Sequence, residues 1–133
     1  MTKLTEQQRE FLANPFVATV TTLRNDGSPH NTVVWMDTDG DTVRFNTAEG
    51  RAKPEHLRSD PRVALTVVDP QNPFKWISVS GRAELTTEDA DAHIDKLAKK
   101  YLDKDVYPGH DPAETRVIVT IEPELIDATG IEG

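Results

Sequence analysis

The sequence contains no cysteine and few aromatic residues, and it is short of positive charge. Without cysteine the chain forms neither disulfides nor thiolate metal sites, which is compatible with a reducing compartment. It has 15 lysines and arginines and 23 aspartates and glutamates, which gives a formal net charge of -8. Because cations that neutralise phosphates drive nucleic-acid binding, this balance argues against a nucleic-acid partner.

Long apolar runs are also missing. No stretch approaches the roughly 20 apolar residues that span a membrane. The first residues, M-T-K-L-T-E-Q-Q-R-E, lack the apolar core of a secretory signal. We therefore expect a cytoplasmic protein with no membrane partner. The length of 133 residues is sufficient for one core, and no repeat or linker divides it, so residues 1–133 are expected to form a single domain.

Short β-branched segments separated by turn residues dominate the chain, and they alternate between apolar and polar residues. They predict strands over 16–23, 30–36, 42–46, 63–68, 76–85 and 116–121, with a weaker strand over 124–129. Asp26-Gly27 and the segment 37–41 are turns short enough for antiparallel hairpins. Gly81, inside a strand, indicates a bulge or a close backbone approach.

Helices are few. The patterns predict them over Thr5–Ala13, with Thr5 as the N-cap, over Glu55–Ser59 and over Thr87–Leu102. Most turns are too short for the crossovers that parallel strands require. Six antiparallel strands with short turns therefore predict an α+β fold that is mainly β, built on a small barrel with a few flanking helices.

The most informative stretch is F-N-T-A-E-G-R-A-K-P-E-H-L, residues 45–57. It places Asn46, Thr47, Arg51 and Lys53 around Gly50, directly after a predicted strand. An amide and a hydroxyl supply hydrogen bonds, while arginine offers a planar fork and lysine a compact charge. A helix that starts after Gly50 adds its N-terminal dipole. We interpret the cluster as a phosphate site for a flavin-like cofactor.

The order of strands, together with R-A-K-P-E-H-L-R-S-D-P-R-V-A-L-T-V at 51–67, resembles the pyridoxamine 5'-phosphate oxidase-like superfamily. The resemblance covers about Phe11 to Ala128, and a second anchor is the strand 77–85 with Gly81 and Ala83. It implies a six-stranded antiparallel split β-barrel, known as the FMN-binding split barrel. It also implies a homodimer with cofactor sites at the interface.

Two cofactors compete within this superfamily, FMN and the deazaflavin coenzyme F420. Oxidases that bind FMN and pyridoxamine phosphate usually carry Arg and Lys on the second strand, whereas residues 30–36 contain neither. The R-x-K-x-x-x-L pattern resembles the F420-dependent branch instead. The resemblance implies an F420H2-dependent oxidoreductase that transfers a hydride to an electron-poor, unsaturated small molecule. An FMN-dependent oxidoreductase and a non-catalytic flavin- or deazaflavin-binding protein remain the alternatives.

The resemblance also implies roles for particular residues. The phosphate-binding positions correspond to Asn46, Thr47, Arg51 and Lys53. The strand beside the ring system corresponds to His30, Asn31, Thr32 and Val33. Residues of the later strand that reach the cofactor of the other subunit correspond to Trp76 and Arg82. Tyr107 and His110, in a late loop, are expected near the substrate on position alone.

No residue is predicted to act as a catalytic acid or base, since hydride transfer depends on positioning and on the cofactor. The histidines His30, His56, His93 and His110 lack the spacing of metal ligands, so no metal site is expected. His93 is predicted to lie on the surface of its helix.

Overall fold

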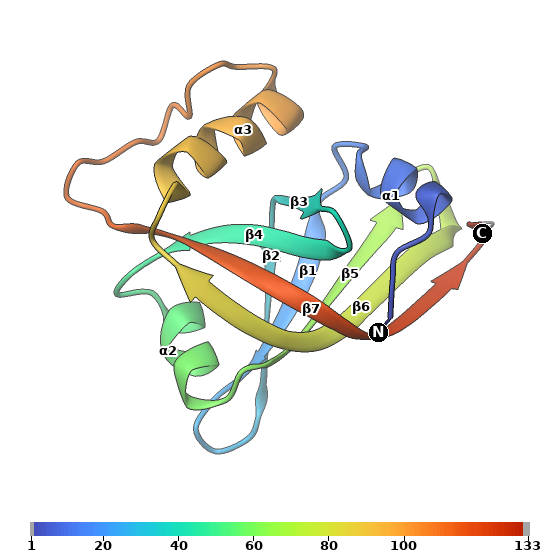
Figure 1. The fold of residues 1–133 in the computed structure, drawn as a ribbon, viewed down its shortest axis with the longest axis horizontal. Coiled ribbons are helices and arrows are strands. Elements are labelled where there is room, and N and C mark those ends of the chain that lie inside the picture. Colours follow the sequence, from blue (N-terminus) through green and yellow to red (C-terminus); the bar gives the residue numbers. More distant parts are fainter. Residues whose placement is uncertain (1, 132–133) are drawn as a thin grey trace.

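The structure is a computed structural model that describes residues 2–131. One antiparallel sheet with the strand order β2-β1-β5-β6-β7-β4-β3 makes up most of the molecule. Figure 1 shows that this sheet curls into an open barrel, with α3 above β4 and α2 at the opposite side. The predicted α+β, mainly β, split-barrel class is confirmed.

The helices are α1 (Glu6–Leu12), α2 (Ala52–Ser59) and α3 (Ala90–Leu102). The strands are β1 (Ala18–Leu23), β2 (Pro29–Val34), β3 (Met36–Asp39), β4 (Thr42–Ala48), β5 (Arg62–Asp69), β6 (Asn72–Thr86) and β7 (Arg116–Thr129). None of the helices in residues 2–131 is both long and apolar enough to cross a membrane.

The sheet has seven strands rather than the six that the sequence predicts. The expected strand 30–36 is divided at Trp35, because β2 pairs with β1 while β3 turns away to pair with β4. Part of the expected turn 37–41 thus belongs to a strand. Conversely, the two strands expected near the C-terminus form one strand, because β7 continues without a break through Pro123.

Three further boundaries differ from the sequence-based expectation. Helix α2 begins at Ala52 because Pro54 lies in the first turn, where its missing N–H costs no helical hydrogen bond. Helix α3 begins at Ala90, after Asp89 in the left-handed conformation (φ 61°). Strand β6 begins at Asn72, inside the stretch expected to be a loop.

Gly81 has the predicted bulge and the predicted close approach. The register of β6 with β7 shifts between Ser80 and Gly81. A Cβ atom at Gly81 would lie 1.9 Å from the Glu122 carbonyl oxygen, far inside van der Waals contact. Only glycine therefore permits this approach of the two strands.

The core fills the concave side of the curled sheet. Phe45, Met36, Leu65, Ile77 and Ile121 are among its fully buried side chains. Thr5 is the N-cap of α1, as predicted, and the Gln8 side chain completes a reciprocal capping box with it. Helix α1 packs against β3, while α3 packs against β4 and β7.

Candidate functional site

A hollow of about 250 Å³ lies where β4, α2, α3 and the start of β7 meet. Its lining combines polar and apolar side chains: Val17, Val33, Val34, Trp35, Asn46, Thr47, Arg51, Lys53, Ile94, Leu97, Tyr107 and Arg116. We call this hollow the cationic pocket. Gly50, with φ +85°, makes the turn between β4 and α2 that brings Thr47, Arg51 and Lys53 to it.

Three cations line the cationic pocket: Arg51, Lys53 and Arg116. Burial, followed by the charge of Arg51, lowers the pKa of Lys53 below its ordinary value. The same two causes, in the same order, lower the pKa of Arg116. Like charges held together and partly desolvated favour an anion between them. In a chain of net charge -8, this concentration of positive charge is a specific feature.

Two polar atoms at the cationic pocket are buried without a hydrogen-bond partner in the part of the chain that the structure describes. They are Thr47 Oγ1 and Arg116 Nη1, and their residues are 1% and 6% exposed. The carboxylate oxygen Glu114 Oε1 is 3.7 Å from Arg116 Nη1, which is an ionic contact without a hydrogen bond. Buried polar groups in folded proteins are normally paired, so these two atoms are available to bind a ligand. A hydroxyl and a guanidinium N–H suit a phosphate oxygen.

Asn46 lies between the pocket and the interior, with its amide engaged on both sides. Its Oδ1 accepts a hydrogen bond from Arg116 Nε at 2.8 Å. Its Nδ2 lies 3.0 Å from the Ala90 carbonyl oxygen and 3.1 Å from His93 Nδ1. Asn46 thus anchors one end of the Arg116 guanidinium.

The polar chain continues from His93 into the protein. His93, which the sequence predicts at the surface, is 4% exposed, because α3 turns this face toward β4. His93 Nε2 is 3.1 Å from Asp37 Oδ1, and Arg44 binds both oxygens of Asp37, at 3.0 and 2.8 Å. Burial raises the pKa of Asp37, but hydrogen bonds from His93 and Arg44 outweigh it, so the pKa of this carboxyl is below its usual value.

The other wall of the cationic pocket is aromatic and aliphatic. Trp35 stacks on Tyr101 with ring centroids 5.3 Å apart and meets Tyr107 edge-on at 5.9 Å. The Arg116 guanidinium carbon lies 5.6 Å from the centre of the Tyr107 ring. The Tyr101 hydroxyl fixes this wall by donating to the Phe16 carbonyl at 2.7 Å and accepting from the Met36 N–H at 3.1 Å. An apolar slot beside a cationic end suits a planar ligand that carries an anionic group.

The structure brings together several residues that the sequence predicts for the site. The pocket lining includes all four expected phosphate-binding residues, one residue of the expected ring strand and one expected substrate residue: Asn46, Thr47, Arg51, Lys53, Val33 and Tyr107. His30, Asn31 and Thr32 lie farther along β2 and are not among the lining residues.

Three other predicted residues lie outside the pocket lining. Trp76 pairs with Val68 and Thr129 in the sheet. Arg82 is exposed and lies 3.7 Å from Glu124. His110 contacts Asp95 Oδ1 at 2.6 Å and packs against the Tyr107 ring. Among residues 2–131, no group of at least three His, Cys, Asp or Glu side chains is suited to hold a metal ion.

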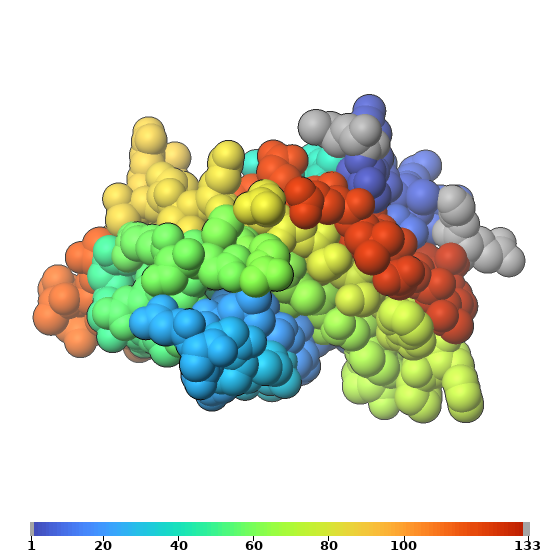
Figure 2. Space-filling view, turned by 90° about the horizontal axis from the view of Figure 1, so that it is seen from below, coloured from blue at the N-terminus to red at the C-terminus, as the bar shows by residue number. Residues whose placement is uncertain are grey.

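The sequence-based prediction missed Arg116, Trp35 and the buried role of His93. Arg116 opens an apolar strand, R-V-I-V-T-I, and a cation at that position is the one signal that the sequence offers. Its place in the site depends on the pairing of Arg116 with Ala48, which puts it beside the end of β4. Figure 2 shows the orange segment before β7 against the green segment that contains the start of α2, where Arg51 binds Glu114.

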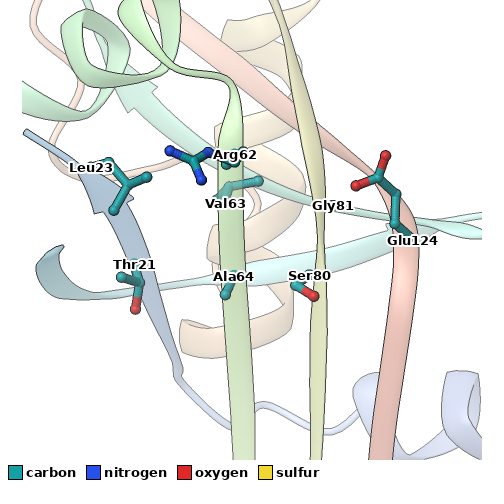
Figure 3. Close-up of a pocket in the computed structure, with 8 residues that line it drawn as sticks. All are labelled: Thr21, Leu23, Arg62, Val63, Ala64, Ser80, Gly81 and Glu124. Carbon is teal, nitrogen blue, oxygen red and sulfur yellow. The ribbon is translucent and has the colours of Figure 1, made fainter. Parts of the chain in front are cut away.

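A second hollow, of about 310 Å³, lies on the convex face of the sheet (Figure 3). Thr21, Ala64 and Ser80 form a row across β1, β5 and β6, with Arg62 and Glu124 at its border. Neighbouring positions of β1, β2, β5 and β6 on this face are also uncharged: Thr19, Asn31, Val33, Thr66, Val68, Trp76 and Ser78. We call these positions, with the row, the uncharged face. On β7, the charged Asp127 pairs with Ser78 at the edge of this face. Val33, which is 65% exposed, belongs both to this face and to the lining of the cationic pocket.

Comparison with known proteins agrees with this geometry. The family described as "Pyridoxamine 5'-phosphate oxidase" matches residues 4–130. A protein of Mycobacterium tuberculosis (strain CDC 1551 / Oshkosh), named F420H(2)-dependent biliverdin reductase, is 32% identical over 127 residues. That alignment covers 94% of this chain and 88% of the relative.

Solved structures give a consistent picture of the fold. A structure named F420 Reductase superposes with a TM-score of 0.80 at 29% identity, over 93% of this chain and 98% of the other. General Stress Protein 26 of Bacillus anthracis superposes with a TM-score of 0.70 at 19% identity, over 96% and 94% of the two chains. The latter similarity concerns the fold alone.

Proposed function

Because this chain belongs to the pyridoxamine 5'-phosphate oxidase family, we propose that it is an F420H2-dependent oxidoreductase. The reaction is hydride transfer to an electron-poor, unsaturated small molecule, and the bound deazaflavin supplies the hydride. Two similar proteins, the M. tuberculosis reductase and the solved F420 Reductase, carry names that refer to F420.

The observation that carries this proposal is a pair of buried atoms at the cationic pocket, Thr47 Oγ1 and Arg116 Nη1, which have no hydrogen-bond partner within residues 2–131. They fit a cofactor phosphate, with Arg51 and Lys53 adding charge at the same end. Arg51 is the N-cap of α2 and no side chain within residues 2–131 caps the helix, so its dipole favours the same anion. The ring system of the cofactor would lie along Val33, Trp35 and Tyr107.

The chain's own residues bind and shield the cofactor. Apolar side chains at the pocket, such as Ile94 and Leu97, limit the access of water to the reacting atoms. No protein acid or base is assigned, since positioning is the main requirement of hydride transfer. FMN is the second candidate, favoured by the family name and by a phosphate site that either cofactor would fill. The absence of Arg and Lys over 29–34 in β2 favours F420.

The proposal includes a homodimer whose second subunit covers the uncharged face. In a chain with 29% charged residues, so many neutral positions on one exposed face favour burial against a protein. Val33 connects this face to the cationic pocket, so a second copy there would add a wall to the pocket. Trp76 lies on the face and Arg82 near its border, which suits residues that contact the partner's cofactor.

The test is a fluorescence titration of the purified protein with F420, run beside FMN. Saturable binding of F420 at micromolar protein, without FMN binding, supports the proposal and justifies a substrate screen with F420H2. A preference for FMN transfers the protein to the flavin-dependent group. Tight F420 binding without turnover on quinones, enones and tetrapyrroles would indicate a binding protein. Absence of binding to either cofactor contradicts the proposal.

Oligomeric state is tested separately by sedimentation, with Val33→Lys as the variant. A charge at this 65% exposed position should convert a dimer into a monomer, because an unpaired buried charge is costly. Glu84→Lys, an exposed change on β6 beyond the uncharged face, is the control. A monomeric wild type contradicts the dimer.

A further inference from the structure

The chain of polar side chains behind the cationic pocket has an orientation that follows from its chemistry. The Ala90 carbonyl oxygen can only accept a hydrogen bond, and Arg116 Nε can only donate one. Both contact the amide of Asn46. The amide therefore has one orientation, with Oδ1 toward Arg116 and Nδ2 toward Ala90. The second hydrogen of Nδ2 then faces His93 Nδ1, at 3.1 Å.

This orientation determines the tautomer of His93. Because Asn46 Nδ2 donates, His93 Nδ1 accepts, and the proton of the neutral ring is on Nε2. Nε2 then donates to Asp37 Oδ1, at 3.1 Å. The Asp37 carboxylate is held in turn by Arg44. With His93 4% exposed, water is poorly placed to replace either partner.

We propose that His93 is a positioning residue, which acts through Asn46 to hold the Arg116 guanidinium toward the anionic group of the cofactor. Arg116 is anchored at Nε by Asn46, while its Nη1 has no hydrogen bond within residues 2–131. Removing the acceptor at His93 Nδ1 leaves one Asn46 N–H unpaired, so that only Ala90 holds the amide nitrogen and Asn46 positions Arg116 less firmly. The expected affinity loss rests on the proposed function, whereas the order of the side chains does not.

Two substitutions distinguish the hydrogen bond of His93 Nδ1 from that of His93 Nε2. His93→Asn places an amide oxygen near the position of Nδ1, so it keeps an acceptor for Asn46 and loses the contact with Asp37. His93→Gln places an amide nitrogen near the position of Nε2, so it keeps a donor for Asp37 and loses the acceptor for Asn46. Each variant removes one of two buried hydrogen bonds, which makes them matched controls for stability.

The first measurement is the dissociation constant for F420, with inorganic phosphate as a competitor. His93→Gln should weaken F420 binding about tenfold, the loss expected for one poorly placed charged contact. His93→Asn should bind F420 within about twofold of wild type. Equal losses in both variants, equal retention in both, or a larger loss in His93→Asn would overturn the proposal.

The second measurement needs no cofactor and no variant of His93. Nitrogen chemical shifts of the His93 ring should show a proton on Nε2 and a bare Nδ1 in the wild-type protein. The Arg116 Nε–H signal, identified by its loss in Arg116→Lys, should exchange slowly with solvent. A proton on Nδ1, or rapid exchange of Arg116 Nε–H, would overturn the proposal.

These measurements distinguish a failure of the proposed function from a failure of the proposed role of His93. A wild-type protein that binds neither F420 nor phosphate contradicts the proposed function, while the ring shifts and Arg116 exchange still decide the role of His93. Conversely, tight F420 binding with an Nδ1-protonated His93 preserves the proposed function and removes the positioning role.

Discussion

Arg51 and Glu114 form an ion pair at the cationic pocket, with Nη2 and Oε2 2.7 Å apart. The other oxygen of the same carboxylate, Oε1, is 3.7 Å from Arg116 Nη1. Glu114 therefore contacts two of the cations to which we assign the cofactor phosphate. Its carboxylate would therefore compete with that anion for both guanidinium groups.

We expect Glu114→Gln to increase affinity for F420, because a competing internal anion is removed. An exposed ion pair is worth about 0.5–1 kcal/mol, so the gain should be roughly two- to fivefold. Titration of both proteins with F420 at low salt measures it. Glu49→Gln is the control, since Glu49 binds Arg58 at 2.9 Å and Arg58 is not a lining residue of the pocket. An equal gain in the control would mean that only net charge matters.

The double variant Arg51→Ala, Lys53→Ala should lose cofactor affinity and keep its fold. Each charged contact is worth about 1–3 kcal/mol, so the combined loss is at least tenfold. The Arg51 side chain is 52% exposed, so the thermal midpoint should change little. Fluorescence titration and thermal unfolding measure the two effects, with Arg58→Ala as the control on the same helix. Unchanged affinity would place the phosphate elsewhere.

Thr47→Val separates ligand binding from stability. Thr47 Oγ1 is buried and has no hydrogen-bond partner within residues 2–131, so an apolar group of equal shape should leave the free energy of unfolding unchanged or raise it. F420 affinity should fall by about 1 kcal/mol, because one donor to the phosphate is lost. Urea unfolding and titration on the same samples measure both. A clear loss of stability would show that the hydroxyl has a structural partner.

Affinity for the anion should fall as the pH rises into the alkaline range. Burial and Arg51 lower the pKa of Lys53 in the free protein, and a bound anion raises it again. Binding therefore takes up a proton when the pH approaches the free-state pKa, and affinity decreases with pH. Full loss of the charge costs roughly tenfold, and the fall should begin below the ordinary pKa of lysine, about 10.4. Lys53→Arg, which stays protonated, should show a flatter profile in the same titrations.

Much of the fold could be predicted because its signals are local. The alternation within 16–23 and 63–68, the Asp26-Gly27 turn and the bulge at Gly81 each depend on neighbouring residues. The division of 30–36 at Trp35 could not be predicted in this way. It arises because β2 pairs with β1 and β3 pairs with β4. The segment T-V-V-W-M contains no turn residue that would indicate this change of partner.

The site was predictable where it is contiguous in sequence. Thr47, Arg51 and Lys53 lie within one short segment, whereas Arg116 enters the pocket only through the pairing of β7 with β4. The buried position of His93 could not be predicted for a similar reason. Its helix has polar residues around it in sequence, and only the packing of α3 on β4 shows that the ring contacts Asn46 and Asp37.

Tyr101→Phe should destabilise the wall of the cationic pocket. The Tyr101 hydroxyl satisfies the Phe16 carbonyl and the Met36 N–H, and its removal leaves two backbone groups without this partner. We expect a loss of about 1–3 kcal/mol in the free energy of unfolding, measured by urea denaturation. The change leaves the ring stacked on Trp35, so packing is conserved.

Tyr107→Phe is the control, because it removes a hydroxyl for which the structure shows no hydrogen bond within residues 2–131. It should cost less than 0.5 kcal/mol, about the effect of an ordinary surface change. Equal losses in the two variants would mean that the Tyr101 hydrogen bonds do not stabilise this wall.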